Sequence, residues 1–361
     1  MKKIMSLVLA IVVSVSLVAC SGGATTSVAT PAPSTEISNV GTETKASGEV
    51  KEIKLGYSMP SLVSTVWVAN QDYFLEEAEK YNTEHPEVHI TPVITIADND
   101  ANMQHSQIMD LINNDCDVIF CAPVDSTAIW PSVTESINAG IPMIALGRKF
   151  SDGAPTPASA TYAWDVKDSA YQGAKKLLEM MINNGFAAED IKPIHIVGDL
   201  RDENAVLYMD GVRQAFDEYG VKEIALVESE WKAETCQTRL AAAVQANPEV
   251  NYIYCPNDSL VGAVQSVLDR NGMWKKIDDP GHVYVCSAGG NANGLEYLRD
   301  GYLDFNIVEP IRELMRTAIE QGVAIAMGQQ PKDMVLDCYN VTLDMYDEYA
   351  EKGLMIGLDY E

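Results

Sequence analysis

The stretch that decides the fold runs from Asp117 to Arg148 and reads DVIFCAPVDSTAIWPSVTESINAGIPMIALGR. It contains two short apolar runs, Val118–Cys121 and Pro142–Leu146, neither of which alternates polar with apolar residues. Strands buried on both faces of a parallel sheet have this composition. The residues between the runs fit a helix that ends at Gly140, because glycine commonly terminates a helix before the next strand. The stretch therefore predicts a β-α-β unit, the building block of a parallel sheet.

The same alternation continues from Val50 onward, and nine predicted strands exceed the five or six of one doubly wound sheet. We therefore predict an α/β fold with two doubly wound parallel-sheet lobes. The loop at 151–160, which contains Pro155 and Pro157, is predicted to carry the chain from the first lobe to the second. The other predicted strands are 53–57, 88–94, 194–197, 223–227, 252–255, 283–286 and 305–308, and the main helices are 67–81, 103–113, 166–184, 205–219, 234–246, 260–271 and 311–327.

The composition restricts the partners of the protein. The chain has 361 residues, with 52 Asp and Glu against 25 Lys and Arg, for a formal net charge of −27. Phosphate backbones repel such an acidic surface, which argues against nucleic-acid binding. Hydrophobic residues make up 47% of the chain, enough for the cores of two domains of ordinary size.

Residues 1–19 have the features of a secretory signal peptide, because Lys2 and Lys3 precede an apolar run too short for an ordinary membrane span. The run ends in Leu17-Val18-Ala19-Cys20, which resembles a bacterial lipobox. A chance cysteine after a plain signal peptide is the alternative. We expect cleavage before Cys20, lipidation of that cysteine with diacylglycerol and palmitate, and a disordered Ser-, Thr- and Pro-rich tether over residues 20–50.

Four segments, in this order along the chain, resemble the type I periplasmic sugar-binding proteins, the ribose- and galactose-binding relatives of the lactose-repressor effector domain. The resemblance covers about residues 52–345, and the order and spacing of the segments make it specific. The segments are IKLGYS at 53–58, the stretch at 117–148, IYCPNDSLVGA at 253–263, and GLEYLRDGYL at 294–303 with NIVEP at 306–310.

This resemblance implies two lobes joined by three crossovers, here near Ala163, Glu309 and Asp337, with a ligand held in the cleft between the lobes. It implies an N-terminal lobe of residues 51–163 plus 310–336 and a C-terminal lobe of residues 164–309 plus 337–361.

The resemblance also suggests ligand-binding residues at the carboxyl ends of strands, where open α/β sheets bind their ligands. Arg148 matches the family's cleft arginine, and its planar fork of donors suits vicinal hydroxyls. The alternative is a surface or hinge salt bridge. Asn257 matches the family's hydroxyl-binding asparagine and Asp258 follows it directly, while a helix N-cap is the alternative for both.

Further candidates lie near the crossovers and in the first strand-to-helix region. Glu309 stands where the family has a glutamine, and its carboxylate can accept hydrogen bonds from hydroxyl or ammonium donors. Asp165 falls where the family places cleft or hinge polar groups. Trp67 and Trp164 are the candidate aromatic platforms for a sugar ring. Trp130 is predicted to lie in the core, while Trp231 and Trp274 fall in loops and are uninformative. Asp125-Ser126 fits an N-cap and interlobe contact better than a ligand group.

Several positions depart from the ribose-binding members. Gly147 and Ala122 stand in place of an Asp and an Asn, and the second cleft arginine falls nearest Tyr208. The Asp after the strand at 283–286 is replaced by Ala288-Gly289-Gly290. These departures argue against ribose itself and leave open a larger or less hydroxylated ligand bound by aromatic stacking.

Rival chemistries find little support in the sequence. The run GGNANG at 289–294 lacks the spacing of a phosphate-binding loop, and the five histidines lack the spacing of a metal site. No nucleophile elbow occurs. The run DNDAN at 98–102 imitates the start of a calcium loop, but it lacks the Gly and the terminal Glu, so a helix N-cap is the better interpretation. We predict no cofactor, no transition metal and no enzymatic activity.

The sequence thus predicts a monomeric, lipid-anchored extracellular solute-binding protein, held to the membrane by its anchor only. It would capture a small carbohydrate or similar polar ligand by hinge closure and deliver it to the permease subunits of an ABC transporter. Three alternatives stay open. The chain could be a sensor that presents its closed form to a histidine kinase or chemoreceptor, a receptor for a non-sugar ligand such as a nucleoside, or a surface enzyme.

Overall fold

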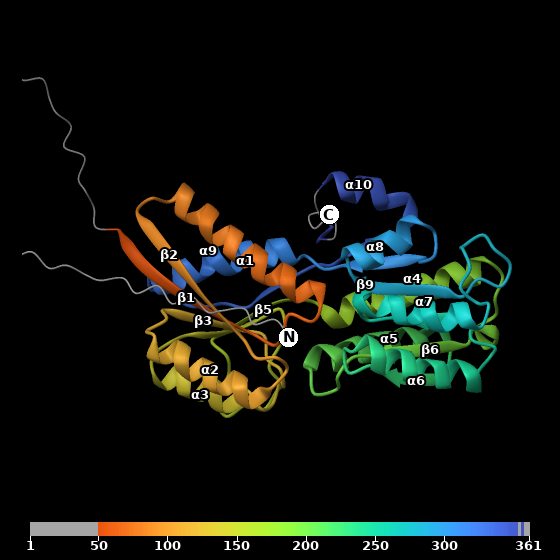
Figure 1. Cartoon of the computed structure of the whole chain (residues 1–361), viewed down its shortest axis with the longest axis horizontal. Coiled ribbons are helices and arrows are strands. Elements are labelled where there is room, and N and C mark those ends of the chain that lie inside the picture. The colour runs from red at the N-terminus through yellow and green to blue at the C-terminus, as the bar shows by residue number, and fades with distance from the viewer. Residues whose placement is uncertain (1–49, 353–354, 357–361) are drawn as a thin grey trace, which may run out of the picture. The chain divides into compact units, whose positions relative to one another are not determined.

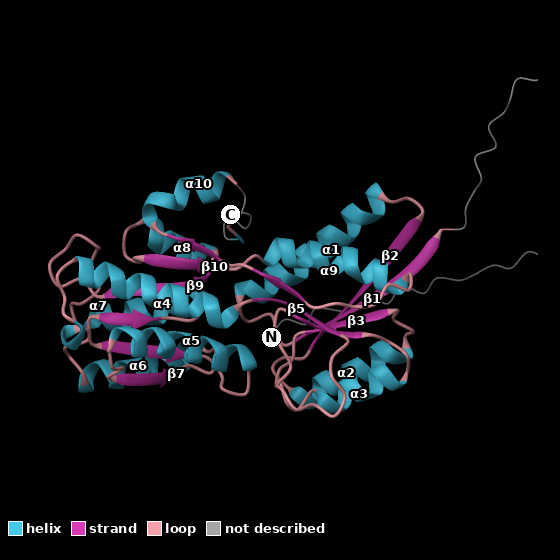
Figure 2. Cartoon of the chain, turned by 180° about the vertical axis from the view of Figure 1, so that it is seen from behind, coloured by secondary structure: helices cyan, strands magenta, loops and turns pink. Residues whose placement is uncertain are grey.

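The computed structural model describes residues 50–352 and 355–356, so the predicted signal peptide, Cys20 and most of the tether lie outside the described residues. Two six-stranded sheets form the framework of the described chain. Helices cover both faces of each sheet (Figure 1; Figure 2). The predicted fold class, α/β with two parallel-sheet lobes, is confirmed. None of the helices in the described ranges is long and apolar enough to cross a membrane.

The first sheet has the strand order β11-β5-β4-β3-β1-β2, and every neighbouring pair in it is parallel. Helices α1 and α9 lie on one face and α2 and α3 on the other (Figure 1). The strands are β1 (Lys51–Met59), β2 (Val88–Ile96), β3 (Val118–Cys121), β4 (Met143–Leu146), β5 (Ala160–Trp164) and β11 (Met334–Leu336); the helices are α1 (Thr65–Glu84), α2 (Ala101–Asn113), α3 (Trp130–Asn138) and α9 (Ile311–Ala326).

The second sheet has the order β12-β10-β9-β8-β6-β7, and it is parallel except for the antiparallel pair β10–β12. Helices α4 and α5 pack on one face and α6, α7 and α8 on the other (Figure 2). The strands are β6 (Pro193–Val197), β7 (Ala225–Glu228), β8 (Tyr252–Tyr254), β9 (Tyr284–Gly289), β10 (Phe305–Val308) and β12 (Tyr339–Val341); the helices are α4 (Val166–Asn183), α5 (Glu203–Tyr219), α6 (Ala233–Ala246), α7 (Val261–Arg270), α8 (Ala292–Arg299) and α10 (Tyr346–Glu351).

The chain passes between the sheets at three places in the described ranges. It leaves the first sheet after β5, returns to it between β10 and α9, and leaves it again between β11 and β12. The prediction that the loop at 151–160 carries the first passage is wrong, because this loop leads into β5, which pairs with β4 in the same sheet. Three strands, β5, β11 and β12, were not predicted, because each is short and lies beside a lobe crossing rather than in a regular β-α repeat.

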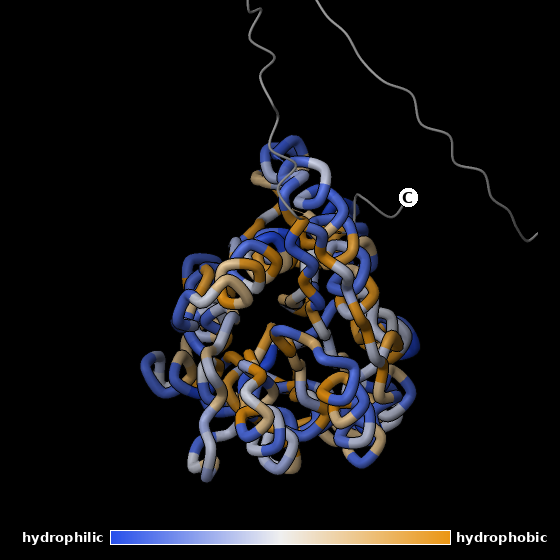
Figure 3. Tube along the Cα trace, turned by 90° about the vertical axis from the view of Figure 1, so that its left-hand side faces the viewer, coloured by the Kyte–Doolittle hydropathy of each residue, from blue (hydrophilic) through white to orange (hydrophobic). Residues whose placement is uncertain are grey.

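Each sheet buries an apolar core against its helices. Hydrophilic residues colour most of the outer loops, and hydrophobic residues gather in the strands and on the inner sides of the helices (Figure 3). Phe74, Phe120 and Tyr162 pack together in the first lobe, and Phe216 meets Tyr252 edge to face in the second. Gly140, which was predicted to end a helix, has a positive φ angle, which confirms that prediction, and Gly185, Gly220 and Gly272 after later helices share this conformation.

Helices α4 and α5 pack so closely that one position between them admits no side chain. A Cβ atom on Gly211 of α5 would lie 2.3 Å from the backbone oxygen of Lys167 and 2.9 Å from the Cβ of Ala170, both on α4. Gly262 of α7 offers a contrast, because a Cβ there would meet nothing within 4 Å. Substitution of each glycine by alanine therefore separates the effect of crowding between helices from the effect of helix propensity.

We expect Gly211→Ala to destabilise the protein by about 1–3 kcal/mol, because the added methyl group overlaps the backbone of α4 and must push α4 away from α5. Gly262→Ala should be neutral or stabilising by up to ~1 kcal/mol, because alanine is the better helix former and the site is open. Urea titrations followed by circular dichroism measure both. Equal stability of the two variants would show that the α4–α5 spacing is not set by Gly211.

Candidate ligand-binding site

A cavity of about 230 Å³ lies between the two lobes. Its lining residues follow the carboxyl ends of strands in both sheets, as expected for ligand sites of open α/β sheets. The first lobe contributes the segments after β1, β2, β3 and β4 and the last residue of β5, and the second lobe contributes the segments after β6, β7, β8 and β10. The charged, amide and aromatic groups that line it are Trp67, Asn99, Arg148, Trp164, Asp199, Arg201, Asp202, Asn204, Tyr208, Glu230, Trp231, Lys232, Asn257 and Glu309.

The structure brings five of the seven predicted ligand-binding residues to this cavity and leaves two elsewhere. Those that line it are Arg148, Asn257, Glu309, Trp67 and Trp164. Asp258 and Asp165 are not among the lining residues. Their carboxylates have other partners, described below.

Arg148 lies at the centre of the contacts between the lobes. Its guanidinium donates to the carbonyl of Pro123 at 2.8 Å, forms an ion pair with Asp202 at 2.8 Å, and lies over the ring of Trp67 at 5.2 Å from the ring centroid. The side chain is buried, and its Nε has no hydrogen-bond partner. Arg148 therefore keeps one buried N–H group without a partner in the described chain. Arg148 therefore lines the cavity and also forms a salt bridge, which are the two roles that the sequence suggested for it.

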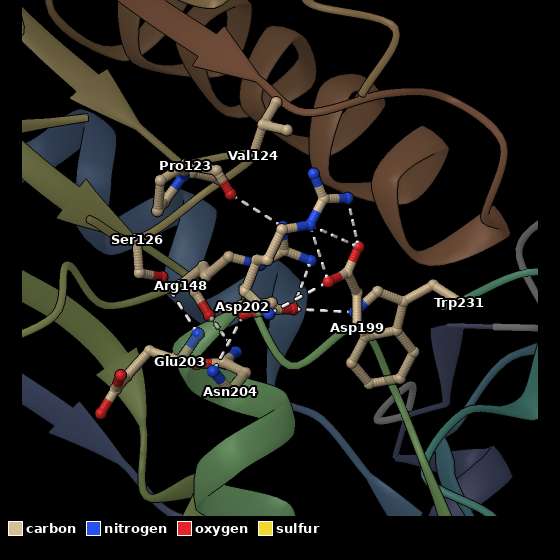
Figure 4. A network of polar contacts seen from close by, with 12 residues as sticks. Pro123, Val124, Ser126, Arg148, Asp199, Asp202, Glu203, Asn204 and Trp231 are labelled. Atoms are coloured by element: carbon tan, nitrogen blue, oxygen red, sulfur yellow. Dashed lines mark hydrogen bonds and ion pairs between the residues drawn. The ribbon is translucent and has the colours of Figure 1, made fainter. Parts of the chain in front are cut away.

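Asp202 joins the α5 end of the second lobe to the first lobe (Figure 4). It caps α5 by accepting from the backbone N–H of Asn204, and it accepts from the indole of Trp231 at 2.9 Å as well as from Arg148. Burial raises the pKa of Asp202, and the nearby Arg148 opposes that shift. Because the carboxylate is 1% exposed, it depends on these donors for its charge.

Further polar contacts join the lobes beside this ion pair. The Asn204 amide donates to the carbonyl of Gly147 at 3.0 Å, and the backbone N–H of Glu203 donates to the hydroxyl of Ser126 at 3.0 Å. The backbone N–H of Ser126 donates in turn to the carbonyl of Arg201. The predicted interlobe role of Ser126 is therefore confirmed, and Asp125 caps its own turn by accepting from two backbone N–H groups.

Trp231 is a cavity residue that the sequence analysis treated as uninformative. It adopts φ 57°, and its indole lies so close to Gly198 that a Cβ there would come within 2.0 Å of the ring. Gly198 directly follows β6, so the absence of a side chain at this strand end makes room for the ring. With Trp67 and Trp164, Trp231 gives the cavity three indole groups.

Glu309 lies at the crossover between β10 and α9, and only 5% of its surface is exposed. The phenol of Tyr208 donates to its Oε1 at 2.7 Å. Burial raises the pKa of Glu309 to about 7, although the Tyr208 hydrogen bond opposes the shift and nearby Asp258 adds to it. The carboxyl group therefore changes charge near neutral pH.

Asn257 and Asp258 have different roles although they are neighbours. Asn257 lines the cavity, and its Oδ1 accepts from the backbone N–H and the hydroxyl of Ser259, so the N-cap interpretation also holds for it. Asp258 is fully buried behind it, where Ser287, Asn306 and the backbone N–H of Asn291 all donate to its carboxylate. Since these donors use the carboxylate to tie β9 and β10 together, we withdraw Asp258 as a ligand contact.

The two candidates near the first crossover also differ. Asp165 is exposed and caps α4 by accepting from the backbone N–H of Asp168 at 2.9 Å, so its carboxylate serves the helix and not the cavity. Trp164 is 3% exposed and lies beneath Gly147, and its indole N–H has no hydrogen-bond partner. Trp164 thus lines the cavity while its indole N–H stays buried and without a partner.

The residues that sequence reasoning missed lie mostly in one segment, Asp199 to Tyr208. Their signal was available, because a polar run directly follows the predicted strand at 194–197, as Arg148 and Asn257 follow theirs. Within the run, Arg201 donates two side-chain hydrogen bonds to Asp199, which hold the pKa of Asp199 below its ordinary value although burial would raise it. Tyr208 stands where the sequence analysis noted the loss of a second cleft arginine.

Two α/β lobes that enclose a polar and aromatic cavity define a solute-binding protein of the hinged, two-lobed class. The profile of the family described as "Periplasmic binding protein domain" matches residues 55–330. The chain belongs to this family. The family and its relatives are binding proteins, so the prediction of a binding protein rather than an enzyme is confirmed.

Several known proteins are similar to this chain. The D-xylose-binding periplasmic protein of Escherichia coli is 22% identical over 295 residues, which span 80% of this chain and 82% of that protein. The ribose import binding protein of Bacillus subtilis is 23% identical over 294 residues, spanning 79% and 85%. A solute-binding protein of an ABC transporter from Bacillus halodurans, solved with bound myo-inositol, matches with a TM-score of 0.73 at 22% identity and covers 84% of this chain and 99% of that one.

We expect Arg148→Ala to weaken binding of the natural solute at least ~10-fold, because it removes a guanidinium that lines the cavity and the partner of Asp202 in one step. The variant should also lose stability, because Asp202 stays buried without its cation although Asn204 and Trp231 still donate to it. Arg213→Ala is the matched control, because Arg213 pairs with Glu223 at 2.6 Å and does not line the cavity. Calorimetry that returned the wild-type dissociation constant for Arg148→Ala would remove Arg148 from the site.

Glu309 should make the stability of the protein depend on pH. Its pKa is about 7 in the folded chain against an ordinary value of 4.5, so the folded state holds an extra proton between these values. Stability therefore falls as the pH rises from 4.5 to 7 and levels off above 7, by up to ~3 kcal/mol. In Glu309→Gln this contribution is absent, so urea titrations at pH 5, 6, 7 and 8 should show a flatter profile. Parallel profiles for the two proteins would contradict the assignment.

Proposed function

We propose that this protein is a lipid-anchored extracellular receptor that captures a small carbohydrate or similar polar solute and delivers it to an ABC permease. The observation that carries the proposal is the interlobe cavity, in which an arginine fork, amide groups, a carboxyl group and three indoles converge. Planar hydrogen-bonding groups suit the hydroxyls of a sugar, and aromatic faces suit the apolar side of its ring.

The size of the cavity favours a small solute. Its volume of about 230 Å³ lies below the ~300–1,000 Å³ of sites for drug-sized ligands. A single sugar ring or a polyol therefore fits better than an oligosaccharide. The ligands of the relatives and structural neighbours agree with this, since they include D-xylose, ribose, D-allose and myo-inositol.

Capture would proceed by hinge closure. The three crossing segments act as the hinge between an N-terminal lobe of residues 51–163 plus 310–336 and a C-terminal lobe of residues 164–309 plus 337–361. A solute that touches Arg148 on one lobe and Asn257 on the other favours the closed arrangement to the extent that it binds that arrangement more tightly than the open one. We also propose that the protein acts as a monomer.

The location of the protein follows from its first residues and its relatives. Relatives that are periplasmic proteins support export, and the sequence Leu17-Val18-Ala19-Cys20 supports a lipid anchor at Cys20. Two or more acyl chains hold a protein stably on a membrane.

Replacement of the anchor cysteine tests this location. The wild-type protein should fractionate with membranes and incorporate labelled palmitate, whereas Cys20→Ser should lose the label. Labelling of Cys20→Ser at the wild-type level would overturn the anchor. Cys338→Ser, which removes a cysteine of the folded part instead, is the matched control.

A sensory role is the second candidate, and one structural similarity favours it. The fructose-binding periplasmic domain of a hybrid two-component system matches with a TM-score of 0.73 at 17% identity, and covers 83% of this chain and 94% of that one. The same fold is therefore compatible with signalling. Loss of solute uptake on deletion of the gene supports transport, whereas intact uptake with loss of the transcriptional response supports sensing.

The carbohydrate assignment is tested by a thermal-shift screen of pentoses, hexoses, polyols and nucleosides. A true ligand at 100 times its dissociation constant should stabilise the protein by ~2.7 kcal/mol, which raises the melting temperature by a few degrees. We expect at least one sugar or polyol to do so. Stabilisation by nucleosides alone would replace the carbohydrate with a nucleoside, and no stabilisation by any compound would count against the proposed function.

A further inference from the structure

The charges that line the cavity pair with one another, with one exception. Among the described residues, three cations and four carboxylates line it. Arg148 pairs with Asp202 at 2.8 Å, Arg201 with Asp199 at 2.5 Å, and Lys232 with Glu230 at 3.3 Å. Only Glu309 lacks a cation among these lining groups. The cavity therefore holds one carboxyl group whose charge the lining does not balance.

The surroundings of Glu309 increase the need for a positive charge. Tyr208 of α5 donates to Oε1, and no donor in the described part of the chain reaches Oε2. Asp258, at the start of the turn before α7, is close enough to raise the pKa of Glu309 further, after burial as the main cause. A further titratable neighbour is Cys338 on the crossing from β11 to β12, a partly buried thiol that adds no positive charge. Glu309 also lines a second cavity together with Arg312, Arg316 and Lys352, and these cations form ion pairs with Glu76, Glu313 and Glu348.

The aromatic lining is also compatible with a cation. Tyr208, Trp164 and Trp231 join Glu309 in the same cavity, and Trp67 already holds a cation, the guanidinium of Arg148, over its ring. Aromatic faces attract ammonium groups and also pack against the C–H face of a sugar ring. A ligand with both an ammonium group and a sugar-like C–H face would contact the aromatic side chains and the carboxylate of Glu309 together.

We propose that the solute is a hydroxylated amine, such as an amino sugar or an amino polyol, whose ammonium group binds Glu309. This inference rests on the proposed function and specifies the ligand class within it. The ammonium donates to Oε2 and supplies the missing positive charge, which a neutral sugar cannot do. The hydroxyl groups remain for the other polar side chains of the lining, such as Asn99 and Asn257.

The direct test compares amines with neutral compounds of the same shape. Calorimetric titrations at pH 7 use the pairs D-glucosamine with D-glucose, D-galactosamine with D-galactose, and D-glucamine with D-sorbitol. In at least one pair the amine should bind at least ~10-fold more tightly, which corresponds to about 1.4 kcal/mol. If the neutral member of every binding pair binds as tightly as the amine, the inference is overturned and the proposed carbohydrate receptor stands.

A second measurement follows the proton of Glu309. At pH 7 about half of this group is protonated, and an ammonium beside it lowers its pKa, so amine binding should release about half a proton. Titrations in two buffers of different ionisation enthalpy measure the release. Amine binding without proton release would also contradict the placement of the ammonium at Glu309.

Two variants separate this role from a general effect on the fold. Glu309→Gln keeps the shape but cannot carry the charge, so it should lose the preference for the amine and the proton release while still binding the neutral partner. Glu77→Gln is the control, because Glu77 is also a buried glutamate but does not line the cavity. Equal weakening of amine and neutral compound by Glu309→Gln would overturn the inference. If no compound of either kind binds the wild-type protein, the proposed function fails and the inference fails with it.

Discussion

The ion pair between Arg148 and Asp202 is the contact on which the arrangement of the site depends. Both side chains are buried, and burying two charges costs free energy that their attraction offsets only with good geometry and further hydrogen bonds. Those further bonds come from Pro123, Asn204 and Trp231, which lie on different strand ends. The pair therefore constrains how the lobes meet more than it stabilises either lobe. Loss of one partner would leave a buried charge facing the cavity.

The ion pair also explains why the cavity lies where it does. Arg148 is held at the end of β4 and Asp202 at the start of α5, so the polar ends of the two sheets face one another across the cavity. Residues that complete the contact, such as Gly147 and Ser126, use backbone or hydroxyl groups. Because Glu309 lies in a crossing segment, a solute that binds it touches the hinge as well as both lobes. Binding and closure are then parts of one equilibrium.

Much of the framework could be predicted from the chain. The β-α alternation and the glycines at helix ends indicated two parallel sheets, since short apolar strands and helix caps are local signals. The family resemblance, with the rule that ligand groups follow the carboxyl ends of strands, selected Arg148, Asn257 and Glu309, and all three line the cavity. The same rule did not separate Asn257 from Asp258, because neighbouring residues at a strand end can point to opposite sides. It was also not applied to the run from Asp199, although that run follows a predicted strand.

The amino-acid pattern alone determined the class of fold, the order of its elements and most strand ends, because these depend on the hydrophobicity and turn chemistry of neighbouring residues. Only the tertiary structure decided which polar groups satisfy one another. Three features depend on residues that are far apart in the chain or on different lobes. They are the pairing of Arg148 with Asp202, the contact of the Trp231 indole with Gly198, and the environment of the Glu309 carboxyl group beside Tyr208. Charge balance in a cavity is a property of all its walls together, and no single segment contains that information.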